Sequence, residues 1–372
     1  MAWKDYTVRI NNNPALGAIT QDVIDGIWDG NGAQGNYPNL DNRNYLNLEI
    51  DEIGGSVTYS ANASIGTTKK DTVFTLLRVM GDMTINSGVT VTTPARKLGL
   101  AILVNGNCTI NGTLDMTARG ANHNGSSIAG STTPNSADSG FLNTYPGRVI
   151  RLFSGNLNLV SLSGTTATVG GGVSNIALPD QGTGGGLSPG LPGTNASDTS
   201  LATGGGGSGG NSSGGLGAVG STFGGGTGGG GAGAGSGSTS GTSGTLNGGR
   251  GGSGGSGGSG AGGSGAGNPG GISGNAGGQT GAGGLLILFV TGNLNIGTSG
   301  KLLSRGSNGG ASNTSAGGSG GGSGGGVICV AANTYSLTSG YEISATGGLK
   351  GAVGTGTGNG GNGSVNLYKL GA

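Results

Sequence analysis

The sequence is poor in charged and aromatic residues, which make up only 8% and 4% of its 372 residues. Its 16 basic and 15 acidic side chains leave a net charge of +1, so the long-range attraction that nucleic-acid binders rely on is missing. Apolar residues reach only 32%, too few for the compact cores that a chain of this length would normally need. We therefore expect neither a nucleic-acid partner nor a conventional large enzyme.

Long apolar segments and metal-binding side chains are scarce as well. The longest apolar stretch, residues 285–290, is far shorter than the roughly 20 residues that cross a bilayer as a helix. The N-terminal segment has no apolar stretch typical of a secretion signal. We therefore expect no membrane insertion and no signal peptide. The single histidine, His123, offers none of the usual zinc or Ser-His-Asp constellations, so we predict no metal and no cofactor.

The two cysteines are also predicted to be structural. Cys108 and Cys329 each occupy an apolar position in a strand-like segment, and their wide separation matches no metal-binding or redox motif. We therefore predict that both are buried thiols.

Glycine, in contrast, is abundant, with 97 residues, about a quarter of the chain against a usual share near 7%. Across residues 204–284 about half of the positions are glycine, and Arg250 is the only charge. The stretch GGSGGSGGSG from Gly251 repeats with period three, which matches an extended helix with three residues per turn. A flexible linker is one reading of this tract. We predict the other, a bundle of polyglycine II helices whose side-chain-free faces let neighbouring backbones bond closely.

A second pattern is a repeated apolar run, followed by a Gly-Asn, Gly-Asp or Ala-Asn turn and a short alternating segment. Glycine and asparagine tolerate sharp bends, and the alternation places apolar side chains on one face of a strand. Each copy is typical of one winding of a β-solenoid, or of a strand pair in a layered β structure, and its apolar face needs a neighbouring copy to be buried. The copies begin at Val73, Leu100, Val149, Leu285 and Val327.

These patterns predict an all-β fold with little or no α-helix, in which stacked β-solenoid-like windings accompany a polyglycine II helix bundle. We expect an N-terminal attachment or assembly domain over residues 1–70 and a β-winding domain over 71–180. The glycine-rich polyglycine II region then occupies 181–284. Further windings with glycine-rich excursions follow over 285–372, where each excursion leaves a winding and returns to start the next one.

The carboxylates do not indicate catalysis. A polysaccharide-cleaving site needs paired carboxylates, whereas those of the middle region are scattered in turn-like surroundings, where aspartate stabilises loops. They are Asp115, Asp138, Asp180 and Asp198. We therefore predict no catalytic residue and a protein that is not an enzyme.

Recognition is the more plausible role of the irregular segments 121–147 and 187–203. His123, Phe141 and Tyr145 could stack on a sugar ring or insert into a partner. Within the glycine tract, Leu216, Val219 and Phe223 form the one apolar cluster. This cluster either caps the bundle or anchors a receptor at its tip. The alternative for the irregular segments is that they are ordinary surface loops.

The stretches GGSGGSGGSGAGGSGAG and GGSGGGSGGG, together with variable segments such as GNLNIGTSGKLLSRGSNGG, resemble the glycine-rich adhesins at the long-tail-fibre tips of T-even-like bacteriophages. The resemblance is compositional and covers roughly residues 181–372. It implies a polyglycine II bundle whose variable loops bind outer-membrane proteins of the host. The long apolar windings, and the lack of a recognisable attachment domain, depart from that family, so no binding residue is transferred by motif.

We accordingly expect a bacteriophage virion protein, a tail-fibre or receptor-binding adhesin made in the host cytoplasm. Its expected partners are a bacterial cell-surface receptor, either an outer-membrane protein or a glycan, and other virion proteins that contact residues 1–70. Both a homotrimer and a monomer remain open. The alternatives are a purely structural capsid fibre, decoration or filament subunit, and a polysaccharide-cleaving tailspike.

Overall fold

The computed structural model describes residues 47–68, 73–97, 99–120, 157–173, 281–311, 320–352 and 359–370. These residues contain strands and no helix, and most strand pairs are parallel. At this level the all-β prediction is confirmed. The same part of the chain holds no helix that is long and apolar enough to cross a membrane.

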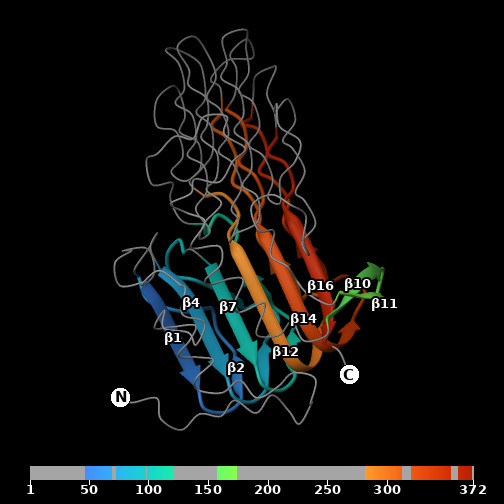
Figure 1. Cartoon of the computed structure of the whole chain (residues 1–372). Coiled ribbons are helices and arrows are strands. Elements are labelled where there is room, and N and C mark those ends of the chain that lie inside the picture. Colours follow the sequence, from blue (N-terminus) through green and yellow to red (C-terminus); the bar gives the residue numbers. More distant parts are fainter. Residues whose placement is uncertain are drawn as a thin grey trace, which may run out of the picture.

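A large sheet of 11 strands dominates the described structure (Figure 1). Six of its strands lie side by side and run parallel, in chain order. They are β1 (Asn47–Ile53), β4 (Val73–Val79), β7 (Gly99–Val104), β12 (Leu285–Ile296), β14 (Val327–Leu337) and β16 (Ser364–Leu370). Three short strands, β2 (Val57–Tyr59), β5 (Met83–Ile85) and β8 (Cys108–Ile110), pair in the same order and join the sheet through β12.

A smaller sheet of five strands repeats this order. Its parallel strands are β3 (Ala63–Ser64), β6 (Thr90–Thr92), β9 (Thr113–Asp115), β13 (Lys301–Leu303) and β15 (Glu342–Ser344). The units that begin with β1, β4, β7, β12 and β14 therefore each contribute at least one strand to each sheet. One apolar cluster joins side chains from both sheets, among them Leu77, Ile102 and Leu288 from the large sheet and Leu114 and Leu302 from the small one.

The first half of strand β12 is apolar throughout, and both of its faces are buried. Leu286 and Leu288 belong to the central cluster, while Ile287 and Phe289 point to the opposite face and are equally buried. A parallel strand that is covered on both faces carries a continuous apolar run in place of a simple alternation. The run ends at Val290, and the register between β12 and β14 shifts between Val290 and Asn293.

The first unit lies within the range 1–70 that the sequence assigns to an attachment domain. Strand β1 pairs with β4 along its whole length, from Asn47 opposite Val73 to Ile53 opposite Val79. Strands β2 and β3 continue the stacking on β5 and β6. The sequence GGSVTY from Gly54 is a weaker version of the turn-and-alternation pattern that begins at Gly81 and Gly106, and it could have identified this unit.

The copy that begins at Val149 does not follow the parallel order of the other units. Strand β7 pairs directly with β12, so the described part of this copy does not lie between its neighbours in the sequence. Its described part forms β10 (Leu157–Ser163), which is antiparallel to β11 (Thr166–Val173) and to β16. The short turn at Gly164, whose φ is 58°, joins β10 and β11 into a hairpin.

A ladder of polar side chains connects the turns of successive units. Ser56 Oγ accepts a hydrogen bond from the Asp82 amide at 2.9 Å, and Asp82 Oδ1 accepts one from the Asn107 amide at 2.7 Å. Asn107 Oδ1 accepts one from the Asn293 amide at 2.9 Å. A Cβ at Gly106 would lie 2.9 Å from the Gly81 carbonyl. The Gly-Asp and Gly-Asn pairs therefore combine a close approach of backbones with a side chain that bonds the next unit.

Replacing Asn107 with alanine is expected to lower the free energy of unfolding by about 1 kcal/mol, because the Asn293 amide loses its acceptor. Asn295→Ala serves as the control, since Asn295 stands on the same strand as Asn293 and the ladder does not include it. Urea unfolding of both variants provides the measurement. Equal urea unfolding midpoints for Asn107→Ala and Asn295→Ala would show that the ladder contributes nothing to stability.

Candidate functional site

Five glycine-rich segments extend from one end of the strands β12, β14 and β16 (Figure 1). Three of them lead into these strands, and the other two leave β13 and β15. They are 281–284, 304–311, 320–326, 345–351 and 359–363, and together we call them the glycine block. Hydrogen bonds join these segments to one another. Among the described residues, segments 304–311 and 345–351 follow β13 and β15, and segments 320–326 and 359–363 lead into β14 and β16.

The hydrogen bonds of the glycine block recur every third residue. The amides of Gly320, Ser323 and Gly326 donate to the carbonyls of Gly310, Ser307 and Ser304, at 2.9, 3.0 and 2.9 Å. From one bond to the next, the donor number therefore rises by three and the acceptor number falls by three. Side chains and bonding groups of a β-strand alternate with period two, whereas an extended helix of the polyproline II type has three residues per turn.

Two further segment pairs show the same period. The amides of Gly306 and Gly309 donate to the carbonyls of Thr346 and Leu349 at 2.8 and 2.9 Å. In the next pair, Gly360 and Gly363 donate to Gly348 and Ala345 at 2.8 and 2.7 Å. The spacing of three is therefore a property of the glycine block and is not restricted to one contact.

The segment 320–326 bonds in more directions than a sheet strand can. Besides its bonds to 304–310, it accepts from the Gly348 amide through Ser323 and from the Gly283 amide through Gly324. It also donates from Gly325 to Gly361. A strand in a sheet has partners only at its two opposite edges. Segment 320–326 has partners in four segments, so the bonds form a three-dimensional network.

Close approach of the segments explains why glycine is needed there. A Cβ at Gly348 would collide with the carbonyl oxygen of Ser307, and one at Gly360 would collide with that of Ser323. The Cα hydrogens at these positions therefore point at carbonyl oxygens, an arrangement that weak Cα–H···O contacts stabilise.

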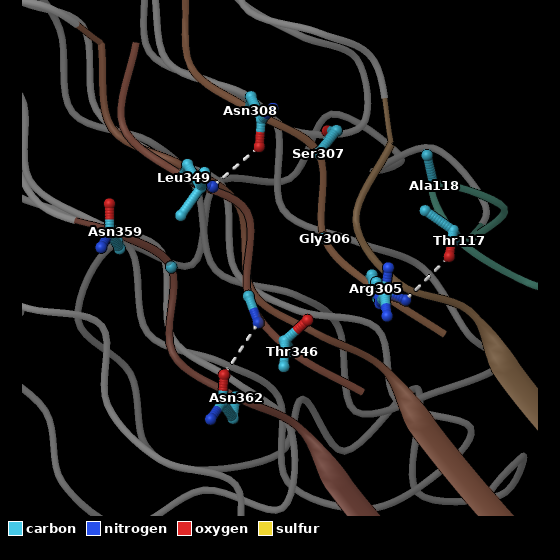
Figure 2. Close-up of a pocket in the computed structure, with 12 residues that line it drawn as sticks. Thr117, Ala118, Arg305, Gly306, Ser307, Asn308, Thr346, Leu349, Asn359 and Asn362 are labelled. Atoms are coloured by element: carbon cyan, nitrogen blue, oxygen red, sulfur yellow. Dashed lines mark hydrogen bonds between the residues drawn. The ribbon is translucent and has the colours of Figure 1, made fainter. Parts of the chain in front are cut away.

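A groove of about 650 Å³ lies at the base of the glycine block (Figure 2). It is lined by residues of the β9 end and of three glycine-block segments. These are Thr117, Ala118, Arg305, Gly306, Ser307, Asn308, Thr346, Gly347, Leu349, Asn359, Gly360 and Asn362. The volume falls within the roughly 300–1,000 Å³ of typical small-ligand sites.

Asparagine side chains hold the segments around the groove. Asn308 Oδ1 accepts a hydrogen bond from the Leu349 amide at 2.8 Å, and Asn362 Oδ1 accepts one from the Gly347 amide at 3.1 Å. Figure 2 shows both bonds as dashed lines. Asn359 Oδ1 accepts one from the Lys350 amide at 2.9 Å. These bonds fix the plane of each side-chain amide.

The charge of the groove is largely compensated. Arg305 is the only charged residue among the described residues that line the groove. It forms an ion pair with Glu342, and its Nε donates to Ser344 Oγ at 3.2 Å. The Lys301 ammonium lies 3.7 Å from the same carboxylate. No Asp or Glu is among the described residues that line the groove. The lining therefore offers mainly neutral amide and hydroxyl groups.

A second polar cluster is formed by Lys97, Glu49 and Thr67, which are distant from most groove residues along the sequence. The Lys97 side chain is fully buried, and its Nζ donates to Glu49 Oε1 at 2.6 Å and to the Thr67 carbonyl at 2.7 Å. Burial alone would raise the pKa of Glu49, but hydrogen bonds from Lys97, Thr67 and Thr75 outweigh it and lower that pKa. The cluster ties the first unit to the chain that follows β6, which is a structural role.

The residues predicted for receptor contact lie outside the described part of the chain. They are His123, Phe141, Tyr145, Leu216, Val219 and Phe223. Of the candidate carboxylates, only Asp115 is described; its Oδ1 accepts a hydrogen bond from the nearby Thr117 amide at 2.7 Å, as in a local turn. The remaining three, Asp138, Asp180 and Asp198, also lie outside the described ranges.

The prediction of buried thiols is confirmed. Cys108 and Cys329 are both free and fully buried. Burial raises the pKa of Cys329 to about 12 and raises that of Cys108 as well. Both thiols are therefore protonated at neutral pH and act as apolar side chains.

The groove itself was missed by sequence reasoning, because its residues come from separate segments that only the hydrogen-bond network brings together. Its one sequence signal is the placement of asparagine in RGSNGG and NGGNG, where amides interrupt glycine. Comparisons of the chain with protein-family models, with curated proteins and with solved structures gave no match.

Proposed function

We propose that this protein is a non-enzymatic bacteriophage virion protein, a tail-fibre or receptor-binding adhesin that presents loops on a rigid glycine-rich scaffold. In this proposal the parallel units form the windings of a β-solenoid, and the glycine block belongs to a polyglycine II bundle. The proposal follows the resemblance of residues 181–372 to the glycine-rich adhesins of T-even-like phages.

The observation that carries the proposal is the period-three hydrogen bonding of segment 320–326. Three residues per turn is the repeat of the polyproline II geometry, and bonds to four neighbouring segments suit packed helices better than a sheet. A scaffold bonded in this way is stiff although it has few side chains. Stiffness favours recognition, because a presented loop loses less conformational freedom when it binds.

The proposed partners follow from this role. A bacterial cell-surface receptor, either an outer-membrane protein or a glycan, would contact the irregular segments 121–147 and 187–203. Other virion proteins would contact residues 1–70. Several copies on one particle, as homotrimers or as monomers on separate fibres, would strengthen weak binding through avidity.

Cell adsorption tests this function. Labelled full-length protein should bind a subset of Gram-negative strains, and replacing segments 121–147 and 187–203 with Gly/Ser sequence of equal length should reduce binding about tenfold or more. A Tyr341→Phe variant is the control, since it removes only the hydrogen bond to the Gly164 carbonyl. Its binding should equal that of the unchanged protein.

Two results would contradict the proposal. Absence of binding to every strain, or binding that survives both replacements, would favour a purely structural capsid fibre, decoration or filament subunit. Release of oligosaccharide from host capsule would instead indicate a polysaccharide-cleaving tailspike. Circular dichroism of each variant would show whether the strand region remains folded.

A further inference from the structure

We infer that the groove at the base of the glycine block binds a neutral, hydroxyl-rich glycan. This inference deepens the proposed function, on which it rests for the source of the glycan, a bacterial surface. The groove uses only described residues and is separate in sequence from the loops expected to meet the receptor. Its residues come from the β9 end and from three segments of the glycine block.

The fixed amides supply the first argument. Because the Oδ1 atoms of Asn308 and Asn362 accept hydrogen bonds from neighbouring backbones, the orientation of each side-chain amide is set before a ligand arrives. The amide of Asn362, which accepts through its oxygen, still carries two N–H donors on its nitrogen. Sugar hydroxyls can accept from such donors, and a donor that is already oriented loses little entropy on binding.

Charge supplies the second argument. The guanidinium of Arg305 is already bonded to Glu342 and to Ser344, so an anionic ligand would have to compete with an existing carboxylate. A charged ligand would also find mainly neutral amides and hydroxyls, which compensate the loss of its hydration poorly. A neutral ligand with many hydroxyl groups neither competes with the Glu342 carboxylate nor loses the hydration of a charge.

Leu349 supplies the third argument. It lines the groove and is 60% exposed, the one large apolar side chain with such exposure in the described structure. Sugars have apolar patches of C–H groups beside their hydroxyls, and sites that bind small ligands combine apolar contact with a few well-placed polar groups. Leu349 and the amide of Asn362, which also lines the groove, form such a pair.

Nuclear magnetic resonance of the full-length, nitrogen-15-labelled protein provides the test. The probes are maltotriose, lactose and N-acetylchitotriose, with glucose 6-phosphate as the anionic comparison. We expect at least one neutral sugar to shift the side-chain amide signals of Asn362, with a Kd of about 1 mM. The signals are assigned from variants in which each one disappears.

Asn362→Asp tests the mechanism, because aspartate keeps the oxygen that accepts from the Gly347 amide but lacks the N–H donors. It should weaken the binding of the neutral sugar about tenfold, and Leu349→Ala should weaken it several-fold. Asn62→Asp is the matched control, since Asn62 Oδ1 likewise accepts from a backbone amide, that of Thr90 at 2.8 Å, outside the groove. Its sugar affinity should not change.

Three outcomes would overturn the inference. The first is no shift with any neutral sugar at about 10 mM, and the second is unchanged affinity in both groove variants. The third is tighter binding of glucose 6-phosphate than of the neutral sugars. The cell-adsorption experiment is independent: if sugars bind and cells do not, the adhesin proposal fails and the groove inference stands. If the protein binds cells but none of the sugars, the groove inference fails and the adhesin proposal stands.

Discussion

Replacing Gly348 with alanine is expected to lower the free energy of unfolding by about 3 kcal/mol, a large effect for a single methyl group. The added Cβ would collide with the carbonyl oxygen of Ser307. Because this oxygen belongs to the backbone of a neighbouring segment, it cannot move away as the end of a flexible side chain could. The segments would have to separate, and the period-three hydrogen bonds of the Gly348 and Gly360 amides would weaken with them.

The matched control is Gly54→Ala, because a Cβ at Gly54 has nothing within 4 Å. Urea unfolding of both variants, combined with amide hydrogen exchange, separates the alternatives. We expect a lower midpoint and faster exchange in the glycine block for Gly348→Ala, and an unchanged midpoint for Gly54→Ala. Similar stability of the two variants would mean that the glycine block is not packed through its backbone, which would remove the main support for the proposed scaffold.

Replacing Glu49 with glutamine is expected to cost about 3 kcal/mol, because breaking a buried ion pair leaves the partner charge uncompensated. Lys97 is fully buried, and Glu49 is its carboxylate partner, with only 12% of the Glu49 side chain exposed. Glu342→Gln is the control. Glu342 pairs with the half-exposed Arg305 and Lys301, and such a pair contributes about 1 kcal/mol or less.

A double variant makes the assignment of this effect to charge testable. Adding Lys97→Met to Glu49→Gln should restore part of the lost stability, because an apolar side chain needs no counter-charge. Denaturant unfolding of the single and double variants completes the cycle. A double variant that is less stable than Glu49→Gln alone would show that the Lys97 bond to the Thr67 carbonyl, and not the charge pair, dominates.

The same cluster predicts a dependence of stability on pH. The folded-state pKa of Glu49 lies below its ordinary value of 4.5, so the folded protein holds the Glu49 proton less tightly than the unfolded chain does. The contribution of Glu49 is therefore present above about pH 4.5 and is lost as the pH falls through the folded-state pKa. The Glu49→Gln variant should lose less stability on acidification than the unchanged protein does.

Local patterns in the sequence identified much of the strand region. The apolar run that begins at Leu285 and the turn at Gly292 predicted a strand and a bend, and β12 contains both. Local patterns cannot decide which copies become neighbours. The copy at Val149 resembles the others, yet its described part pairs antiparallel with β16 and forms a hairpin with β11 through the turn at Gly164.

The candidate groove was less accessible to sequence reasoning. Asn362 stands between two glycines and Asn308 between Ser307 and Gly309, which is compatible with a linker, a turn or a packed segment. Their functional geometry depends on the Leu349 and Gly347 amides, which lie on another segment. Which backbone lies opposite a given amide depends on the register between segments, and a stretch of nearly identical glycines carries little information about register.

The sequence by itself determined the classes of structure open to this chain. So much glycine with so few charges and aromatics leaves a backbone-dominated molecule, and the repeated apolar runs require stacked strands to bury them. Only the tertiary structure decided that β7 lies beside β12, that segment 320–326 bonds four neighbours, and that three segments enclose a groove. The physical reason is that backbone hydrogen bonds are the same for every residue, so their partners are chosen by the packing of the whole chain.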